Sequence, residues 1–145
     1  MSPFTEKRFL PKLNVKPEER EQLIKKITDR LLLKKDIVFA YIHGSFLTSE
    51  SFRDIDIGIF VSTAKDFIFE SDISYELSSA LGYEVEVRII NNAPAAFQMS
   101  VLRDGKVLFS RDEALRSDFI ENVGRKYRDY AHFRNIFMEA VSDHK

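Results

Sequence analysis

Acidic side chains on a predicted strand are the residues of this sequence best suited to chemistry. Asp54 and Asp56 alternate with apolar residues in the segment 54–61. This period of two puts both carboxylates on one face of a strand, with their Cα atoms roughly 6 to 7 Å apart. Flexible carboxylates at that spacing can bind one hard cation such as Mg²⁺ or Mn²⁺. Because an Asp-x-Asp pair alone is more often a solvated sheet face, the prediction needs further residues.

Gly44 and Ser45 supply a second feature. They follow the almost wholly apolar run 37–42, which predicts a strand covered on both faces. A Gly-Ser pair that opens a turn or short helix can offer backbone N–H groups and a hydroxyl to a phosphate, with no Cβ at the glycine to block its approach. A phosphate site would then adjoin the metal site.

A third carboxylate would complete such a site. Glu84 and Glu86 share one face of the alternating segment 83–90, and the spacing leaves both as candidates. In-line transfer of a phosphoryl-type group with two metal ions needs about three oxygen-ligand side chains. One carboxylate would also take the proton from the attacking hydroxyl. Together with the Gly-Ser pair, the three acidic residues predict nucleotide chemistry.

The elements that must position these residues alternate between helices and strands. Their order predicts a mixed α/β (α+β) fold in one domain, residues 16–145, with a four-stranded sheet flanked by helices and an N-terminal arm, residues 1–15. The sheet order cannot be read from the sequence. Thr63 and Asp66 are candidate caps for the second helix, Gly82 is its stop, and Gly124 is a candidate break in the last one. The predicted helices are 17–35, 66–81, a short one that ends at 102, and 112–141; the predicted strands are 37–42, 54–61, 83–90 and 106–109.

Composition limits the class of protein. The chain has 145 residues, 44% of them hydrophobic and 31% charged, and no cysteine. This excludes thiolate zinc sites and cysteine nucleophiles. No apolar run reaches the roughly 18 residues of a membrane span, so we expect a cytoplasmic protein. Residues 36–103 carry ten Asp or Glu and four Lys or Arg, which makes a nucleic-acid partner unlikely unless a metal offsets the carboxylates.

At these residues the sequence resembles the minimal nucleotidyltransferases (MNT), small members of the DNA polymerase β-like superfamily. That family has a hydrophobic strand, Gly-Ser, a spacer, an Asp-x-Asp strand, a helix, and an acidic residue on a later strand that runs into Asn-Asn-Ala-Pro. Residues 86–94 of this chain match that last pattern. Residues 104–109 and 127–130 continue the likeness, which covers about residues 20 to 135.

The resemblance implies a nucleotidyltransferase fold and a role for each site residue. It assigns Gly44 and Ser45 to phosphate binding, and Asp54, Asp56 and Glu86 to catalysis and metal binding. It therefore favours Glu86 over Glu84. The sequence departs from the family pattern in a shorter spacer, in Glu for the commoner Asp at position 86, and in the lack of a basic residue after Gly-Ser. Arg53 could supply the phosphate-facing cation instead.

The resemblance also implies reaction and partner. The expected enzyme transfers a nucleoside monophosphate, AMP from ATP in the first instance, to a hydroxyl of a protein or small molecule. The expected partner is a HEPN-type protein of a toxin-antitoxin pair, and a homo-oligomer is also compatible with the sequence. The alternative is a catalytically degenerate binding module of the same fold, which neutralises its partner by contact. The complete set of Gly44, Ser45 and three carboxylates favours the enzyme.

Three further features have two interpretations each. His43 could contact a nucleotide or be structural, and Arg88 could touch phosphate or, more simply, pair with Glu84 or Glu86. Tyr127, Tyr130, Phe133 and Phe137 recur at helical spacing in the last helix, which suits a docking face and a core face equally.

Overall fold

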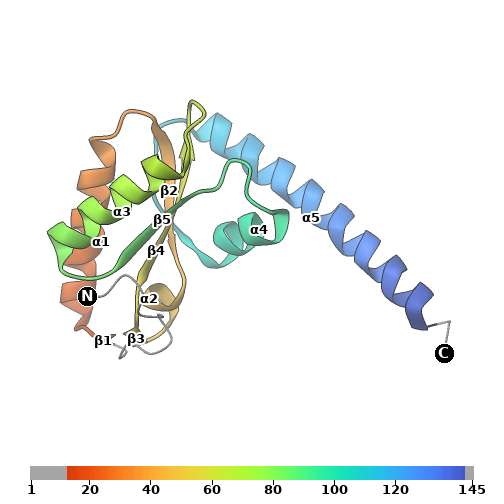
Figure 1. Ribbon diagram of the computed structural model, residues 1–145, viewed down its shortest axis with the longest axis horizontal. Coiled ribbons are helices and arrows are strands. Elements are labelled where there is room, and N and C mark those ends of the chain that lie inside the picture. Colours follow the sequence, from red (N-terminus) through yellow and green to blue (C-terminus); the bar gives the residue numbers. More distant parts are fainter. Residues whose placement is uncertain (1–12, 143–145) are drawn as a thin grey trace.

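A four-stranded mixed sheet lies between two helical layers in the computed structural model, which describes residues 13–142 (Figure 1). Residues 1–12, most of the predicted N-terminal arm, lie outside this range. The mixed α/β class and the number of main strands are confirmed. The elements are β1 (Leu13–Asn14), α1 (Pro17–Leu32), β2 (Ile37–His43), α2 (Ser45–Thr48), β3 (Ser51–Phe52), β4 (Ile55–Val61), α3 (Phe67–Leu81), β5 (Val85–Ile89), α4 (Ala95–Asp104), β6 (Lys106–Ser110) and α5 (Glu113–Ser142).

The strand order of the main sheet is β5-β4-β2-β6, and β1 pairs with β3 in a separate two-stranded sheet. β4 runs antiparallel to β2 and parallel to β5. This register places Asp56 beside His43 on one side and beside Glu86 on the other. The three residues therefore form one row across three strands, although they lie far apart in the sequence.

Two apolar clusters fix the sheet between its helices. On one face, α1 and α3 contribute Leu23, Ile27, Ile73 and Leu77 to a cluster with the odd-numbered isoleucines of β4. On the other face, Val101 of α4 and Phe119 and Val123 of α5 pack against Phe39 and Tyr41 of β2. The apolar run of β2 is thus buried from both sides, as predicted. A Cβ at Gly58 of β4 would meet Val101 of α4, so Asp56, two residues earlier on the strand, lies on the α4 side of the sheet.

The ends of the helices follow local chemistry. The Asp66 carboxylate accepts hydrogen bonds from the N–H groups of Ile68 and Phe69 at the start of α3, and Thr63 lies outside that helix. Gly82 ends α3 in the left-handed conformation, with φ 76°. The predicted break at Gly124 is wrong, because α5 continues through it. A glycine inside a helix costs only about 1 kcal/mol relative to alanine, which packing of Phe119 and Val123 offsets.

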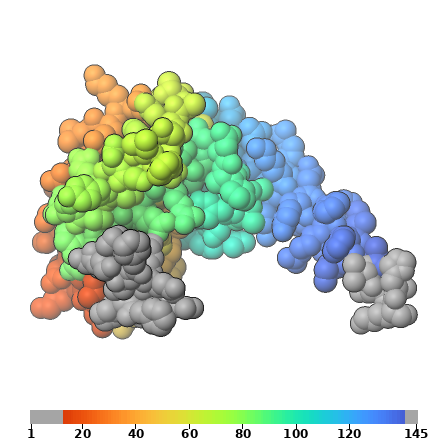
Figure 2. All heavy atoms as spheres, in the orientation of Figure 1, coloured from red at the N-terminus to blue at the C-terminus, as the bar shows by residue number. Residues whose placement is uncertain are grey.

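The outer half of α5 leaves the body of the protein (Figure 1 and Figure 2). Tyr130, Phe133 and Phe137 are 50%, 66% and 56% exposed, so the apolar stripe of this helix is not a core face at these positions. None of the helices within residues 13–142 has the length and apolar content that a membrane span requires.

Side chains of α3 cover the outer edge of β5. The hydroxyls of Ser78 and Ser74 accept hydrogen bonds from the N–H groups of Val85 and Val87, at 2.9 and 2.8 Å. The Glu70 carboxylate accepts the N–H of Ile89 at 2.8 Å. Four residues of helix rise about 6.0 Å and two residues of strand about 6.6 Å, so the two repeats stay in step over this length.

Candidate active site

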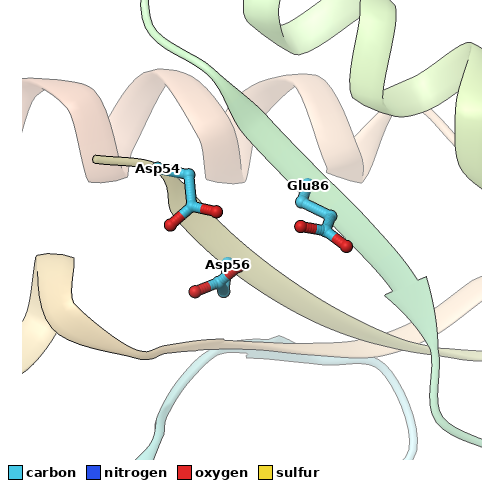
Figure 3. Close-up of side chains that lie close together, drawn as sticks. All are labelled: Asp54, Asp56 and Glu86. Carbon is cyan, nitrogen blue, oxygen red and sulfur yellow. The ribbon is translucent and has the colours of Figure 1, made fainter. Parts of the chain in front are cut away.

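Three carboxylates lie close together at neighbouring strands (Figure 3). Asp54 directly precedes β4, Asp56 is the second residue of β4, and Glu86 comes from β5. One oxygen from each lies within 4.8 Å of the others, and all three residues are half-buried. Parallel pairing of Asp56 with Glu86 brings the third carboxylate to the other two. The structure therefore brings together the three acidic residues that the resemblance had assigned to one site.

The donor set suits a divalent cation. Two oxygens bound to one Mg²⁺ at about 2.1 Å lie at most about 4.2 Å apart, so small side-chain rotations would close the present spacing. Three neighbouring carboxylates also repel one another unless a cation or a proton offsets their charge. The residues present thus fit a divalent metal ion, and the geometry does not select which one.

Gly44 has a conformation that joins the predicted phosphate turn to the carboxylates. Its φ of 84° and ψ of −164° lie in a region that is essentially restricted to glycine. A Cβ at this position would lie 2.4 Å from Oδ2 of Asp56. The absence of a side chain at Gly44 therefore leaves space for the Asp56 carboxylate. The sequence had led us to expect that this space would serve a phosphate. Ser45 begins α2 directly after this turn and is exposed.

Arg88 pairs with Glu86, which is the simpler of its two predicted roles. Its Nε and Nη2 both donate to Oε1 of Glu86, at 2.9 and 2.8 Å. Its guanidinium carbon also lies 5.6 Å from the centre of the Phe97 ring. The hydrogen bond to Glu86, and then the charge of Glu86, raise the pKa of Arg88. A fixed positive charge thus stands at the β5 side of the carboxylates.

His43 packs edge-on against the same Phe97 ring, with the ring centres 5.7 Å apart. Its Nε2 is buried and has no hydrogen-bond partner. Burial lowers the pKa of His43 and the charge of Arg88 lowers it further, against the opposing effect of Glu86 and Asp54. The imidazole is therefore held neutral beside the site, and its contact with a nucleotide stays a prediction.

The other two charged candidates lie at the ends of strands. Arg53 stands between β3 and Asp54, half-buried, and its role in phosphate binding stays a prediction. Glu84 precedes β5, where its carbonyl accepts the N–H of Ile55. Within the described part of the chain, the carboxylate group contains Glu86 and does not contain Glu84.

Arg20 is a positioning residue that sequence reasoning missed. From α1 it donates to the carbonyl oxygens of Phe46 and Ser49, the latter at 2.8 Å. Its guanidinium carbon lies 5.0 Å from the Phe46 ring centre and 5.6 Å from that of Phe52. Arg20 thus fixes the spacer between Gly-Ser and Asp-x-Asp. A basic residue on an amphipathic helix gave no signal of this role, because most such residues form a solvated face.

Side-chain amides after β5 bond to the backbone at the ends of β4 and β5. The side chain of Asn91 accepts the N–H of Val61 at 3.0 Å and donates to the Val61 carbonyl at 2.9 Å. Gln98, which is 1% exposed, donates to the carbonyls of Ile90 and Asn91 from α4. These bonds tie the ends of β4 and β5 together and orient the turn into α4. The role of Asn91 is structural.

Comparison with known proteins agrees with this geometry. The family model described as polymerase beta, nucleotidyltransferase, matches residues 25–114, which is more than half of the chain. The chain belongs to this nucleotidyltransferase family. No curated protein sequence matches it.

Several solved structures share the fold. The MNT antitoxin in complex with the tri-AMPylated Shewanella oneidensis HEPN toxin has a TM-score of 0.71 and 21% identity, over 84% of this chain and 98% of that one. The toxin-antitoxin complex MntA-HepT has a TM-score of 0.65 and 20% identity, over 87% and 98%. A toxin-antitoxin structure with AMP-PNP has a TM-score of 0.66 and 19% identity, over 88% of this chain and 98% of that one.

Proposed function

We propose that this chain transfers AMP from ATP, with Mg²⁺, to a hydroxyl of a HEPN-type partner protein, as the cytoplasmic antitoxin of a toxin-antitoxin pair. The observation that carries the proposal is the meeting of Asp54, Asp56 and Glu86 within 4.8 Å, beside the turn at Gly44. The fold shared with MNT antitoxins supports the choice of partner.

Each site residue has a defined task in this proposal. Asp54 and Asp56 hold the divalent metal, which when bound neutralises charge on the nucleotide's phosphates. Glu86 is the third ligand, and Arg88 holds one of its oxygens in place. Gly44 and Ser45 bind the outer phosphates through the turn into α2, and Arg53 adds positive charge beside them. One of the carboxylates accepts the proton of the attacking hydroxyl.

A complete carboxylate set argues for catalysis over the binding-module alternative. A module that acts by contact has no need to keep three like charges together, since each pair destabilises the metal-free protein. The conformation of Gly44 also argues for catalysis, because it makes room for the Asp56 carboxylate.

The test first isolates a HEPN-type protein by pull-down with the chain as bait, and then combines the two. Intact-mass spectrometry after incubation with ATP and Mg²⁺ should show one or more added AMP groups on the partner. An Asp54→Asn, Asp56→Asn double variant should bind the partner, keep its fold and add none. A HEPN-type partner that stays unmodified by the parent chain yet is inhibited by it would establish the binding module instead.

A further inference from the structure

An open groove of about 700 Å³ crosses the outer edge of β5, between the first turns of α3 and α4. Glu70, Ser71 and Ser74 of α3 form one wall. The other wall is Pro94 and Phe97, and Glu86 and Arg88 line the end nearest the carboxylates. The groove is therefore continuous with the candidate active site.

The groove and the phosphate turn lie on opposite sides of the carboxylates. Gly44 follows β2, Asp54 directly precedes β4, Asp56 is on β4 and Glu86 is on β5, in the strand order β5-β4-β2. A line from Gly44 across Asp56 to Glu86 thus continues into the groove. Figure 3 shows the middle of this order, with Glu86 on the strand next to the two aspartates.

In-line transfer gives this order a chemical meaning. The attacking and leaving oxygens lie on opposite sides of the phosphorus that is transferred. If pyrophosphate leaves toward Gly44 and Ser45, as in the proposed function on which this inference rests, the nucleophile must approach from the β5 side. We propose that this groove admits the hydroxyl-bearing side chain of the acceptor protein. The hydroxyl oxygen bonds to the α-phosphorus of ATP, the bond to pyrophosphate breaks, and the hydroxyl proton passes to a site carboxylate.

The edge of β5 restricts how the acceptor binds. An exposed strand edge commonly takes up an extended peptide as an added strand. Here the N–H groups of Val87 and Ile89 already donate to Ser74 and Glu70. Because these donors are engaged, the acceptor inserts a side chain and does not pair through its backbone. Phe97 and Pro94 pack against the apolar part of that side chain, and its hydroxyl reaches the end formed by Glu86 and Arg88.

Ser71→Trp tests the proposal by filling the groove from α3. Ser71 is exposed and is not among the α3 residues given above as acceptors of β5 N–H groups. AMP transfer to the HEPN-type partner should fall about tenfold or more, because small displacements of a nucleophile cost that much. Affinity for ATP with Mg²⁺, measured by calorimetry, should change less than about twofold. Ala93→Trp narrows the groove from the opposite wall and should act the same way. Ser79→Trp, exposed on α3 outside the groove, is the matched control and should transfer like the parent.

Each outcome decides between explanations. Transfer by both groove variants at the parent's rate would overturn the proposal and leave the proposed function intact. A loss of ATP affinity equal to the loss of transfer would show that the nucleoside, not the acceptor, occupies the groove. If the parent itself modifies no partner, the proposed function has failed and the acceptor groove fails with it.

Discussion

Gly44→Ala should destabilise the metal-free protein through two separable effects. The first is conformational, because φ 84° with ψ −164° costs a residue with a side chain about 1–3 kcal/mol. The second is steric, because the added methyl would lie 2.4 Å from Oδ2 of Asp56. Forced contacts of this kind cost typically about 1–3 kcal/mol. We therefore expect the free energy of unfolding to fall by about 3 kcal/mol, which leaves most single domains folded.

Asp56→Ala separates the two effects. It removes the carboxylate that the new methyl would meet and leaves the next contact, Asp56 Cβ, at an ordinary 3.5 Å. The loss in free energy of unfolding caused by Gly44→Ala should therefore be smaller in that background than in the parent, by at least about 1 kcal/mol. Gly82→Ala is a matched control, since Gly82 also has positive φ but a Cβ there would meet nothing within 4 Å. It should cost about 1–2 kcal/mol and show no coupling to Asp56.

Urea unfolding in EDTA, followed by circular dichroism, measures these values for the six proteins involved. If Gly44→Ala cost the same with and without Asp56, the contact between the turn and the carboxylate would carry no energy. The close approach of Gly44 to the acidic cluster would then be irrelevant to stability, and the reasoning above would be refuted.

Three further predictions concern neighbouring residues. Glu86→Gln should lower AMP transfer by about two orders of magnitude or more, while Glu84→Gln keeps most of it; the reverse result in a single-turnover assay would reassign the third carboxylate. Arg20→Lys should remove the guanidinium hydrogen bonds to the spacer, because a lysine ammonium cannot replace the planar set of donors that binds these carbonyls. Amide hydrogen exchange of residues 46–50 should then become faster. Unchanged exchange would show that Arg20 does not hold the spacer in place. Because the pKa of His43 is lowered from 6.5 in the folded protein, its contribution to stability is complete above that pH and is lost as the pH falls below it. In EDTA, His43→Phe should flatten the pH dependence of urea unfolding between about pH 7 and 5.5, and an unaltered slope would contradict this.

Local sequence patterns were enough to predict the parts of the site that lie on one strand. Alternation placed Asp54 and Asp56 on the same face, and an apolar run that ends in Gly-Ser identified the turn at Gly44. Choosing Glu86 over Glu84 needed the family resemblance, since both share a face of one strand. The pairing of β5 beside β4, which brings Glu86 to Asp56, depends on sheet order and has no local signal.

Other features escaped prediction because they depend on distant partners. Arg20 acts on a spacer 26 to 30 residues away, so its charge pattern on α1 resembles that of any solvated helix. Gly124 was expected to interrupt the last helix, but residues on both sides of it continue α5 and only the inner half is held by the core. The outer aromatic residues kept a core-like spacing although no core lies beneath them.

The hydrogen bonds from α3 to β5 have a consequence for the strand that carries the third carboxylate. A strand at the edge of a sheet is ordinarily aligned by one neighbour, and a slip of two residues preserves which face each side chain occupies. Because the acceptors Ser78, Ser74 and Glu70 repeat in step with the strand, such a slip would exchange their N–H partners along β5. It would move Glu86 along the sheet by about 6.6 Å and out of reach of Asp56. The side chains of α3 thus hold the outer edge of β5 at three points, as β4 holds its inner edge, so residues outside the active site support the strand that carries the third acidic group.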